Sequence, residues 1–201
     1  MSQNTNTVHK SLCSIIVFLI SVPLWAQIEA NAIYSLGEDF RTVKAMEPTA
    51  SNSIIVAGEH EKGGYVAEIT QQGTVLWSHI ITAKKYYQGE VLQDIAVTPD
   101  GTIHVIGECT QLLQIGDRSV PIDNKRYGYY ARLHKDGSLQ GDISLFEDLK
   151  VRSIDPTPTG ELYLTSDAMY GANVEGSRIK VEYTDVIVIK YSASGIPQWT
   201  K

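Results

Sequence analysis

Cysteine is scarce in this sequence, and basic residues are outnumbered by acidic ones. The 201 residues include 2 cysteines, 17 lysines and arginines, and 23 aspartates and glutamates, which gives a formal net charge of −6. Two cysteines cannot make a disulfide-rich scaffold, and the acidic balance argues against a general nucleic-acid-binding protein, which needs a basic surface. A wholly disordered chain is also excluded, because 43% of the residues are hydrophobic and can bury enough apolar surface to offset chain entropy.

Motifs for catalysis, cofactors and metals are lacking as well. The sequence has no G-x-S-x-G, no glycine loop that would bind phosphate, no D-x-D-x-D-G calcium loop and no C-x-x-C pair. The four histidines beyond the N-terminal region do not have ligand spacing such as H-x-x-x-H. His104 stands among β-branched residues, and we expect it to be packed and hydrogen-bonded rather than to act as a base. We therefore predict no catalytic residue, no metal ligand and no cofactor.

A long hydrophobic run occurs only near the N-terminus. Residues 12–26 (LCSIIVFLISVPLWA) follow a polar segment, residues 1–10, which contains Lys10 and no acid. As a helix, this run would reach only about 22 Å, short of the ~30 Å hydrocarbon core of a bilayer. The pattern predicts a secretory signal peptide over residues 1–26, cleaved after Ala26 or, as the second choice, after Ala30. The alternatives are an uncleaved anchor and a buried helix of the folded domain.

Cleavage would leave a mature chain of 175 of the 201 residues, with no transmembrane span. The predicted location is outside the cytoplasm of a bacterium, either secreted, periplasmic or at the cell surface. Cys13 precedes the apolar run, whereas a lipid-attachment cysteine follows it, so we do not expect a lipoprotein. Cys109 would be the one mature cysteine, which cannot close an intrachain disulfide. Its apolar flanks predict a small core residue rather than a reactive thiol.

The sequence after residue 26 contains three copies of one repeat unit. The segment GYVAEI at residues 64–69 recurs as GYYARL at residues 128–133, and VIKY at residues 188–191 aligns with both. A second pattern, PDG before IHVIG at residues 99–101, matches PTG before LYLTS at residues 158–160. A fixed period of this kind is typical of repeat architectures. The turn and aromatic positions that we predict to be structural are Gly73, Trp77, Gly101, Gly137, Gly195 and Trp199.

Each unit is predicted to contain four short antiparallel strands. In the middle copy the expected strands are residues 92–98, 102–108, 129–134 and 138–146, which are enriched in β-branched and aromatic residues and are separated by turn residues. The charged column Glu68, Arg132 and Lys190 is expected on the opposite sheet face from its neighbours, because side chains alternate along a strand. No helical periodicity persists after residue 26, so the predicted fold class is all-β.

Four antiparallel strands in a repeat of this length are typical of a β-propeller blade. The middle copy, VTPDGTIHVIG followed by GYYARLHKDGSL, and the third copy, DVIVIKYSASGIPQW, resemble the bacterial secreted β-propeller repeat, the SBBP-type or seven-bladed β-propeller family. The resemblance covers roughly residues 40–201. It implies an extracytoplasmic propeller, often part of a longer multidomain protein.

Three units are fewer than the four or more blades of a closed propeller. We expect blades at about residues 40–81, 91–146 and 149–201, the last one incomplete, preceded by an N-terminal segment (residues 27–39) with a lone outer closing strand. The prediction is therefore the N-terminal part of a longer reading frame, with further blades encoded beyond residue 201. The rivals are an open stack of β-sheets and a homo-oligomeric ring, both of which leave strand edges exposed.

The expected connections differ on the two rims of such a stack. Tight turns lie on one rim, and all the length variation falls on the other, in residues 82–90, 108–127 and 167–185. Variable loops on a rigid scaffold are where recognition usually resides. The ligand would be a glycan or an anionic group; the alternative is solvated charge with tyrosines packed on the blade tops. The candidate binding residues are Lys84, Lys85, Tyr86, Tyr87, Arg118, Lys125, Arg126 and Tyr127.

These patterns favour an exported, non-catalytic binding or scaffold module at the cell envelope or outside the cell, with a protein or glycan partner and no nucleic acid. The alternative is the N-terminal part of a propeller hydrolase or quinoprotein-like dehydrogenase, with catalytic residues downstream. Ala67, Gly73 and Trp77 resemble the tryptophan-docking repeat of quinoprotein dehydrogenases, but Ile69 replaces its aspartate and an adjacent cysteine pair is missing. A third possibility is a purely structural spacer.

Overall fold

The computed structural model describes residues 40–84, 91–123, 125–174, 176–181 and 184–201. These residues form β-strands and turns and include no helix, so the predicted all-β class is confirmed. None of the described segments is a helix that could cross a membrane. The predicted signal peptide and lone outer strand (residues 1–39) and the candidates Lys85, Tyr86 and Tyr87 lie outside the described residues.

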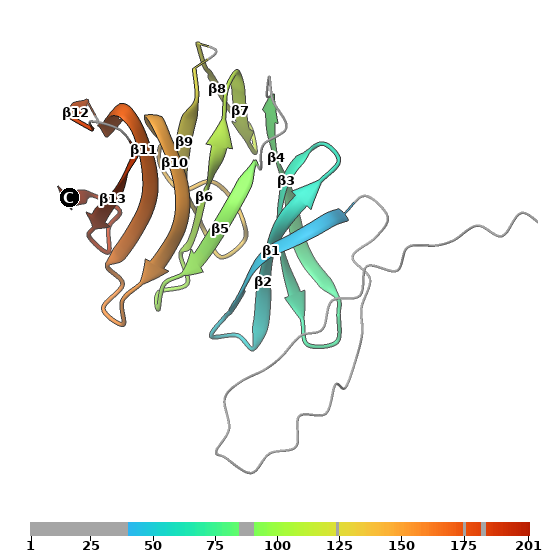
Figure 1. The fold of residues 1–201 in the computed structure, drawn as a ribbon. Helices are drawn as coiled ribbons and strands as arrows, with labels where there is room; N and C mark the ends of the chain where they lie inside the picture. The colour runs from blue at the N-terminus through green and yellow to red at the C-terminus, as the bar shows by residue number, and fades with distance from the viewer. Residues whose placement is uncertain (1–39, 85–90, 124, 175, 182–183) are drawn as a thin grey trace, which may run out of the picture. The chain divides into compact units, whose positions relative to one another are not determined.

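The first sheet begins with a meander of four strands and ends with a hairpin. Backbone hydrogen bonds join the hairpin to the fourth strand, with residues 112–115 opposite residues 81–84. The hairpin therefore adds two strands to a unit that precedes it in the chain (Figure 1). In sheet order, the strands are β1 (Phe40–Pro48), β2 (Ser53–His60), β3 (Gly63–Thr70), β4 (Val75–Lys84), β7 (Leu112–Ile115) and β8 (Arg118–Pro121).

The second sheet consists of two four-stranded meanders that share one long strand. In sheet order, its strands are β5 (Leu92–Val97), β6 (Ile103–Cys109), β9 (Tyr127–Leu133), β10 (Ser144–Pro156), β11 (Leu162–Val174), β13 (Thr184–Tyr191) and β14 (Pro197–Thr200). A short strand, β12 (Ser177–Ile179), pairs with the far end of β11. Residues 144–147 of β10 pair with β9, while β11 pairs with residues 149–156 and, through its far end, also with Phe146 and Glu147. Asp148, with a φ of 58°, stands at the register shift of the β10–β11 ladder between Glu147 and Leu149.

We call these groups of strands the first unit (β1 to β4), the middle unit (β5, β6, β9 and residues 144–147) and the third unit (residues 149–156, β11, β13 and β14). Each contains four consecutive antiparallel strands. The expected strand 138–146 is shorter in the structure, where β10 begins at Ser144. The reason is local: Gly141 has a φ of 76°, which interrupts the extended backbone, and Leu139 forms only an isolated bridge with Leu133.

Tight turns close the hairpins as the glycine pattern predicts. The φ angles of Gly73, Gly101, Gly137, Gly160 and Gly195 are 80°, 85°, 79°, 83° and 75°. Residues with a Cβ pay a steric cost in this region, and glycine does not. Each of these glycines donates its N–H to the carbonyl of the residue three positions earlier, at 2.7 to 2.9 Å.

The middle unit is buried on both faces, because neighbouring residues of its strands belong to two different cores. Val105 and Ala131 contribute to a core with the first unit, which supplies Ile55, Val66 and Ile81. Ile106 and Tyr130 contribute to a second core with the third unit, which supplies Leu164, Ile189 and Tyr191. The alternation along the strands explains how one small sheet serves both cores. Cys109 is fully buried in the first core, as its apolar flanks predict.

Candidate functional site

The β7–β8 hairpin and β12 belong to the two long connections that the structure describes, and both lie at the same end of the strands in Figure 1. The tight turn between β10 and β11 lies at the opposite end. We use the name long-loop rim for the described residues of the segments 108–127 and 167–185, together with the side chains that contact them. Four of the predicted binding residues belong to this rim, and their contacts define what it can bind: Arg118, Lys125, Arg126 and Tyr127.

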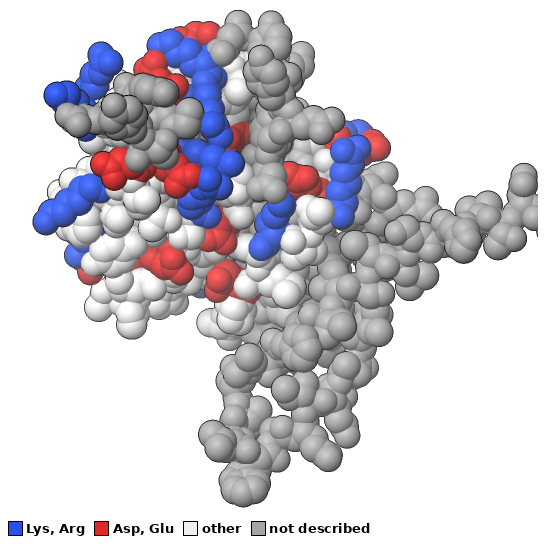
Figure 2. All heavy atoms as spheres, viewed as in Figure 1, with Lys and Arg blue, Asp and Glu red and all other residues white. Residues whose placement is uncertain are grey.

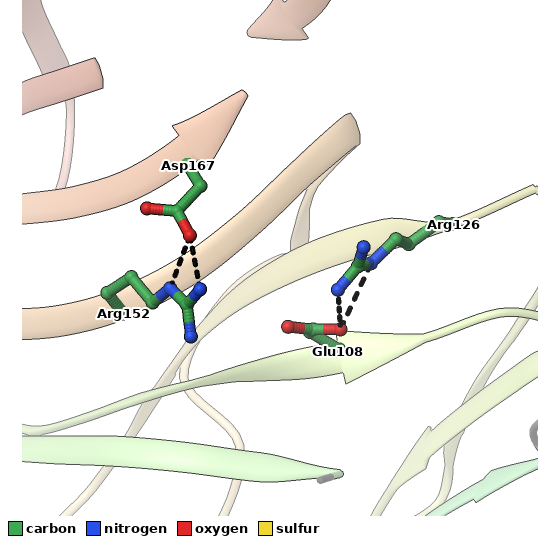
Figure 3. A network of polar contacts seen from close by, with 4 residues as sticks. All are labelled: Glu108, Arg126, Arg152 and Asp167. Atoms are coloured by element: carbon green, nitrogen blue, oxygen red, sulfur yellow. Dashed lines mark hydrogen bonds and ion pairs between the residues drawn. The ribbon is translucent and has the colours of Figure 1, made fainter. Parts of the chain in front are cut away.

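Arg126 and Glu108 form the most buried ion pair of the long-loop rim (Figure 3). Arg126 precedes β9 and donates from Nε (3.1 Å) and Nη2 (2.8 Å) to Oε2 of Glu108, near the end of β6. The Glu108 side chain is only 9% exposed. Its other oxygen, Oε1, is buried and has no hydrogen-bond partner within the described residues. The guanidinium therefore carries most of the charge compensation for a buried carboxylate.

A second arginine–carboxylate pair occupies the neighbouring unit. Arg152 in β10 donates from both Nε (2.7 Å) and Nη2 to one oxygen, Oδ2, of Asp167 in β11 (Figure 3). Asp167 and Glu108 are equivalent positions of the repeat, since LYLTSD aligns with IHVIGE. Sequence reasoning did not single out either carboxylate, although their common position in the repeat was a usable signal. The structure thus places a fixed guanidinium–carboxylate pair on each of two adjacent units.

Lys125 and Tyr127 flank Arg126 and also contact acids. The Lys125 ammonium bonds to Glu147 and lies 3.7 Å from Oδ2 of Asp123. The hydrogen bond to Glu147, followed by the charge of that group, raises the pKa of Lys125. Tyr127 donates its hydroxyl to Oδ1 of Asp123 at 3.1 Å, and burial, followed by this hydrogen bond, raises the pKa of Tyr127. Three of the predicted binding residues are therefore brought together and held by acidic partners.

The other two candidates of the described chain, Arg118 and Lys84, are separate from this group of three residues. Arg118 begins β8 and donates from Nη2 to Asp142 at 2.7 Å, an ion pair in which both side chains are exposed. This contact links the hairpin to the middle unit. Lys84 ends β4, where its backbone pairs with Leu112, and its side chain is outside the described residues. On the face drawn in Figure 2, cationic and anionic side chains lie beside one another. Each described candidate cation (Arg118, Lys125 and Arg126) is neutralised by a carboxylate.

His104 is fully buried between β5 and β9 and is hydrogen-bonded on both ring nitrogens. Nε2 lies 3.2 Å from Oγ1 of Thr98, and Nδ1 lies 2.9 Å from the hydroxyl of Tyr130. The Thr98 hydroxyl has acceptors for its own proton in Asp100 and Thr102. The network therefore assigns the ring proton to Nε2, with Nδ1 as the acceptor. Burial lowers the pKa of His104 from 6.5 to about 4, so the ring is neutral and serves packing, as expected.

Three carboxylates on the first strands of the three units interact, which sequence reasoning missed. Burial, followed by the charges of Asp94 and Asp155, raises the pKa of Glu47. Burial also raises the pKa of Asp94, against the lowering effect of the N–H groups of Ile154 (3.0 Å) and Ile95 (2.9 Å). Because Asp94 caps a backbone N–H of the next unit, it holds two units together. Within the described chain, no group of three or more His, Cys, Asp or Glu side chains could hold a metal ion.

Comparison with other proteins does not identify a relative. The sequence matches no protein-family model and no curated protein. The resemblance to the secreted propeller repeat therefore stays a prediction from its residues, and the contacts described above carry the functional argument.

Proposed function

We propose that this protein is an exported, non-catalytic binding module of the β-propeller type, which acts at the cell envelope or outside the cell and recognises a glycan through the long-loop rim. The observation that carries the proposal is the fixed segment Lys125, Arg126 and Tyr127, each residue of which is held by an acidic side chain. Side chains that are already oriented lose less conformational entropy when a ligand binds.

The stacking of the units supports the propeller part of the proposal. The middle unit buries its two faces against the first and third units, as a blade does between its neighbours. Three units are an arc of a ring, and we propose that further units of the same kind complete it. In such a ring the long-loop rim forms one continuous surface of the disc, where loops from different blades contact the same ligand.

The charge of the rim favours a neutral polar ligand over an anion. Lys125, Arg126 and Arg118 are each compensated by a carboxylate, so the rim offers little excess positive charge. It does offer paired donors and acceptors and the half-buried ring of Tyr127, which are suited to sugar hydroxyls and to the apolar face of a sugar ring. We do not propose an enzyme, since His104 and Asp94 are engaged in contacts that hold strands together.

A glycan array with the exported full chain tests the proposal. The variant Tyr127→Ala should lose binding to a retained glycan by at least about tenfold, since it removes both a ring contact and a hydrogen bond. Lys135→Ala is the matched control, because Lys135 is exposed at a tight turn on the opposite rim and should leave binding unchanged. An array without any bound glycan, or equal binding by both variants, would contradict the proposed function.

Export is tested separately by the N-terminus of the protein recovered from the bacterial envelope or medium. Cleavage after Ala26 gives a chain that begins with Gln27, and cleavage after Ala30 gives one that begins with Asn31. N-terminal sequencing that finds Met1 on the mature protein would contradict the predicted signal peptide.

A further inference from the structure

The outer face of the third unit carries the same columns of residues with which the other two units contact their neighbours. Strand register makes this comparison direct. Glu68 pairs with Trp77 between the third and fourth strands of the first unit, and Lys190 pairs with Trp199 at the same place in the third unit. Aligned in this way, the equivalent residues of the three faces are Ile55, His104 and Tyr163, then Val66, Tyr130 and Val188, then Glu68, Arg132 and Lys190.

At the first junction, Trp77 covers a turn of the middle unit. Its indole N–H donates to the backbone carbonyl of Lys135 at 2.9 Å. A Cβ on Gly137 would lie 2.6 Å from Cε3 of Trp77 and 2.5 Å from Cδ2 of His79. The tryptophan ring therefore rests on a glycine that must stay a glycine, and its N–H is satisfied by the carbonyl two residues before that glycine.

At the second junction, an arginine takes the place of the tryptophan. Arg132 of the middle unit donates to the backbone carbonyl of Ser194, and a Cβ on Gly195 would lie 2.9 Å from its Cδ. The position equivalent to Trp77 is Gly141, where a Cβ would lie 3.2 Å from Nη2 of Arg132. The missing ring leaves space for the guanidinium. Both junctions thus consist of one long side chain that covers a glycine turn of the next unit.

The third face has the covering side chain but no turn beneath it within the described residues. Trp199 is 40% exposed and packs at 6.0 Å, between ring centroids, on Tyr163. The Lys190 ammonium lies 5.8 Å from the centre of the Tyr163 ring and 2.7 Å from Oε1 of Glu161. Val186 is 64% exposed on the neighbouring strand. The indole N–H of Trp199 has no hydrogen bond among the described residues, whereas the indole N–H of Trp77 has two.

We propose that this face, formed by Tyr163, Val186, Val188, Lys190 and Trp199, docks a further four-stranded antiparallel sheet of the same repeat. The turn between the third and fourth strands of that sheet carries a glycine with positive φ, on which the Trp199 ring rests. The carbonyl two residues before this glycine accepts the Trp199 N–H. The inference rests on the stacking of units in the proposed function and is independent of the ligand at the long-loop rim.

A further sheet is favoured over a second copy of this chain. Both described junctions join units that are consecutive in one chain, through Trp77 and Lys135 at the first and through Arg132 and Ser194 at the second. The test below distinguishes the two occupants by their dependence on protein concentration.

The test extends the full chain with the sheet that the first junction selects. A second copy of residues 80–148 is appended after Lys201, because the strand pairing of Trp77 and Trp199 makes Lys201 equivalent to His79. The appended turn equivalent to residues 134–137 can then reach Trp199. Acrylamide quenching of Trp199 is measured as the difference between this protein and its Trp199→Phe variant. We expect the quenching constant of Trp199 to fall at least threefold relative to the unextended chain, and the far-ultraviolet strand signal to rise in proportion to the added residues.

The matched control carries Gly137→Val in the appended copy alone, where a branched side chain cannot fit beneath the ring. Quenching of Trp199 should then return to the value of the unextended chain. An appended sheet that stays unfolded, or that folds without protecting Trp199, overturns the proposal. Concentration-dependent protection of Trp199 in the unextended chain would assign the face to a second copy and overturn it too. Glycan binding by the same proteins reports on the proposed function separately.

Discussion

The indole N–H of Trp77 is shared between the backbone carbonyl of Lys135, at 2.9 Å, and Oε2 of Glu68, at 2.8 Å. The first acceptor is 58 residues away in sequence and belongs to the middle unit, while the second lies on the adjacent strand of the first unit. One donor thus connects the sheet in which it lies to the turn of the next one. The contact between the two units therefore includes a directional hydrogen bond as well as apolar packing.

Trp77→Phe should lower the free energy of unfolding by about 1–2 kcal/mol, because the ring contact persists while both acceptors lose their donor. Trp77→Ala should cost about 3 kcal/mol or more, since the ring contact is lost as well. Urea unfolding followed by circular dichroism measures both. Trp199→Phe is the matched control, because the indole N–H of Trp199 has no hydrogen bond among the described residues. Removing this indole should change the free energy of unfolding little. Equal effects of the two phenylalanine variants would contradict the bridging role of Trp77.

Gly137→Ala should destabilise the protein by about 3 kcal/mol, through a positive φ and through overlap with the rings of Trp77 and His79. Gly116→Ala separates the two causes. Gly116 also has a positive φ, 57°, but a Cβ there would meet nothing within 4 Å, so only the backbone cost of about 1 kcal/mol is expected. Thermal unfolding of both variants measures the difference, and equal melting temperatures would show that the ring does not rest on Gly137.

The lowered pKa of His104 predicts that the free energy of unfolding falls in acid. Its folded-state pKa of about 4 is below its ordinary value of 6.5, so the unfolded chain binds the proton more readily. The contribution of the neutral ring is therefore complete above pH 6.5 and is lost as the pH falls toward 4, by up to about 3 kcal/mol. His104→Gln should lack this pH dependence between pH 4 and 6.5. Urea unfolding across that range tests the sign, and parallel curves for both proteins would contradict it.

The raised pKa values of Glu47 and Asp94 act in the opposite direction. A carboxyl group with a raised pKa binds its proton more readily in the folded state, so stability falls as the pH rises above the ordinary carboxyl range. Both proteins of the His104 comparison contain these acids. The difference between them therefore isolates the histidine.

Arg126→Ala should destabilise the protein by about 2 kcal/mol, because it leaves the buried Glu108 carboxylate without its donor. Adding Glu108→Gln should recover part of the loss, since the uncompensated charge is removed. Arg118→Ala is the matched control, as its pair with Asp142 is exposed and should contribute less than about 0.5 kcal/mol. Equal losses for the two arginine variants, measured by urea unfolding, would show that burial of Glu108 does not set the value of the pair.

The local chemistry of the chain predicts much of its fold. Turn glycines and period-two alternation act over a few residues, so the strands near Gly101 and Gly137 and the buried positions of His104 and Cys109 follow from the sequence. The shared strand β10 does not, because a single residue with positive φ, Asp148, shifts its register against β11 without a turn motif. The partners of Arg126 and Lys125 were also missed, because ion pairs depend on which connections meet in space.

Backbone pairing between strands of different units connects the three units of the described chain. The β7–β8 hairpin leaves the middle unit between β6 and β9 yet hydrogen-bonds to β4, and β10 gives its two ends to different meanders. The first and third units therefore cannot separate from the middle unit without breaking backbone hydrogen bonds between strands. Amide hydrogens of β4, β10 and β11 should therefore exchange with solvent through one collective opening, and the three units should unfold together rather than one at a time.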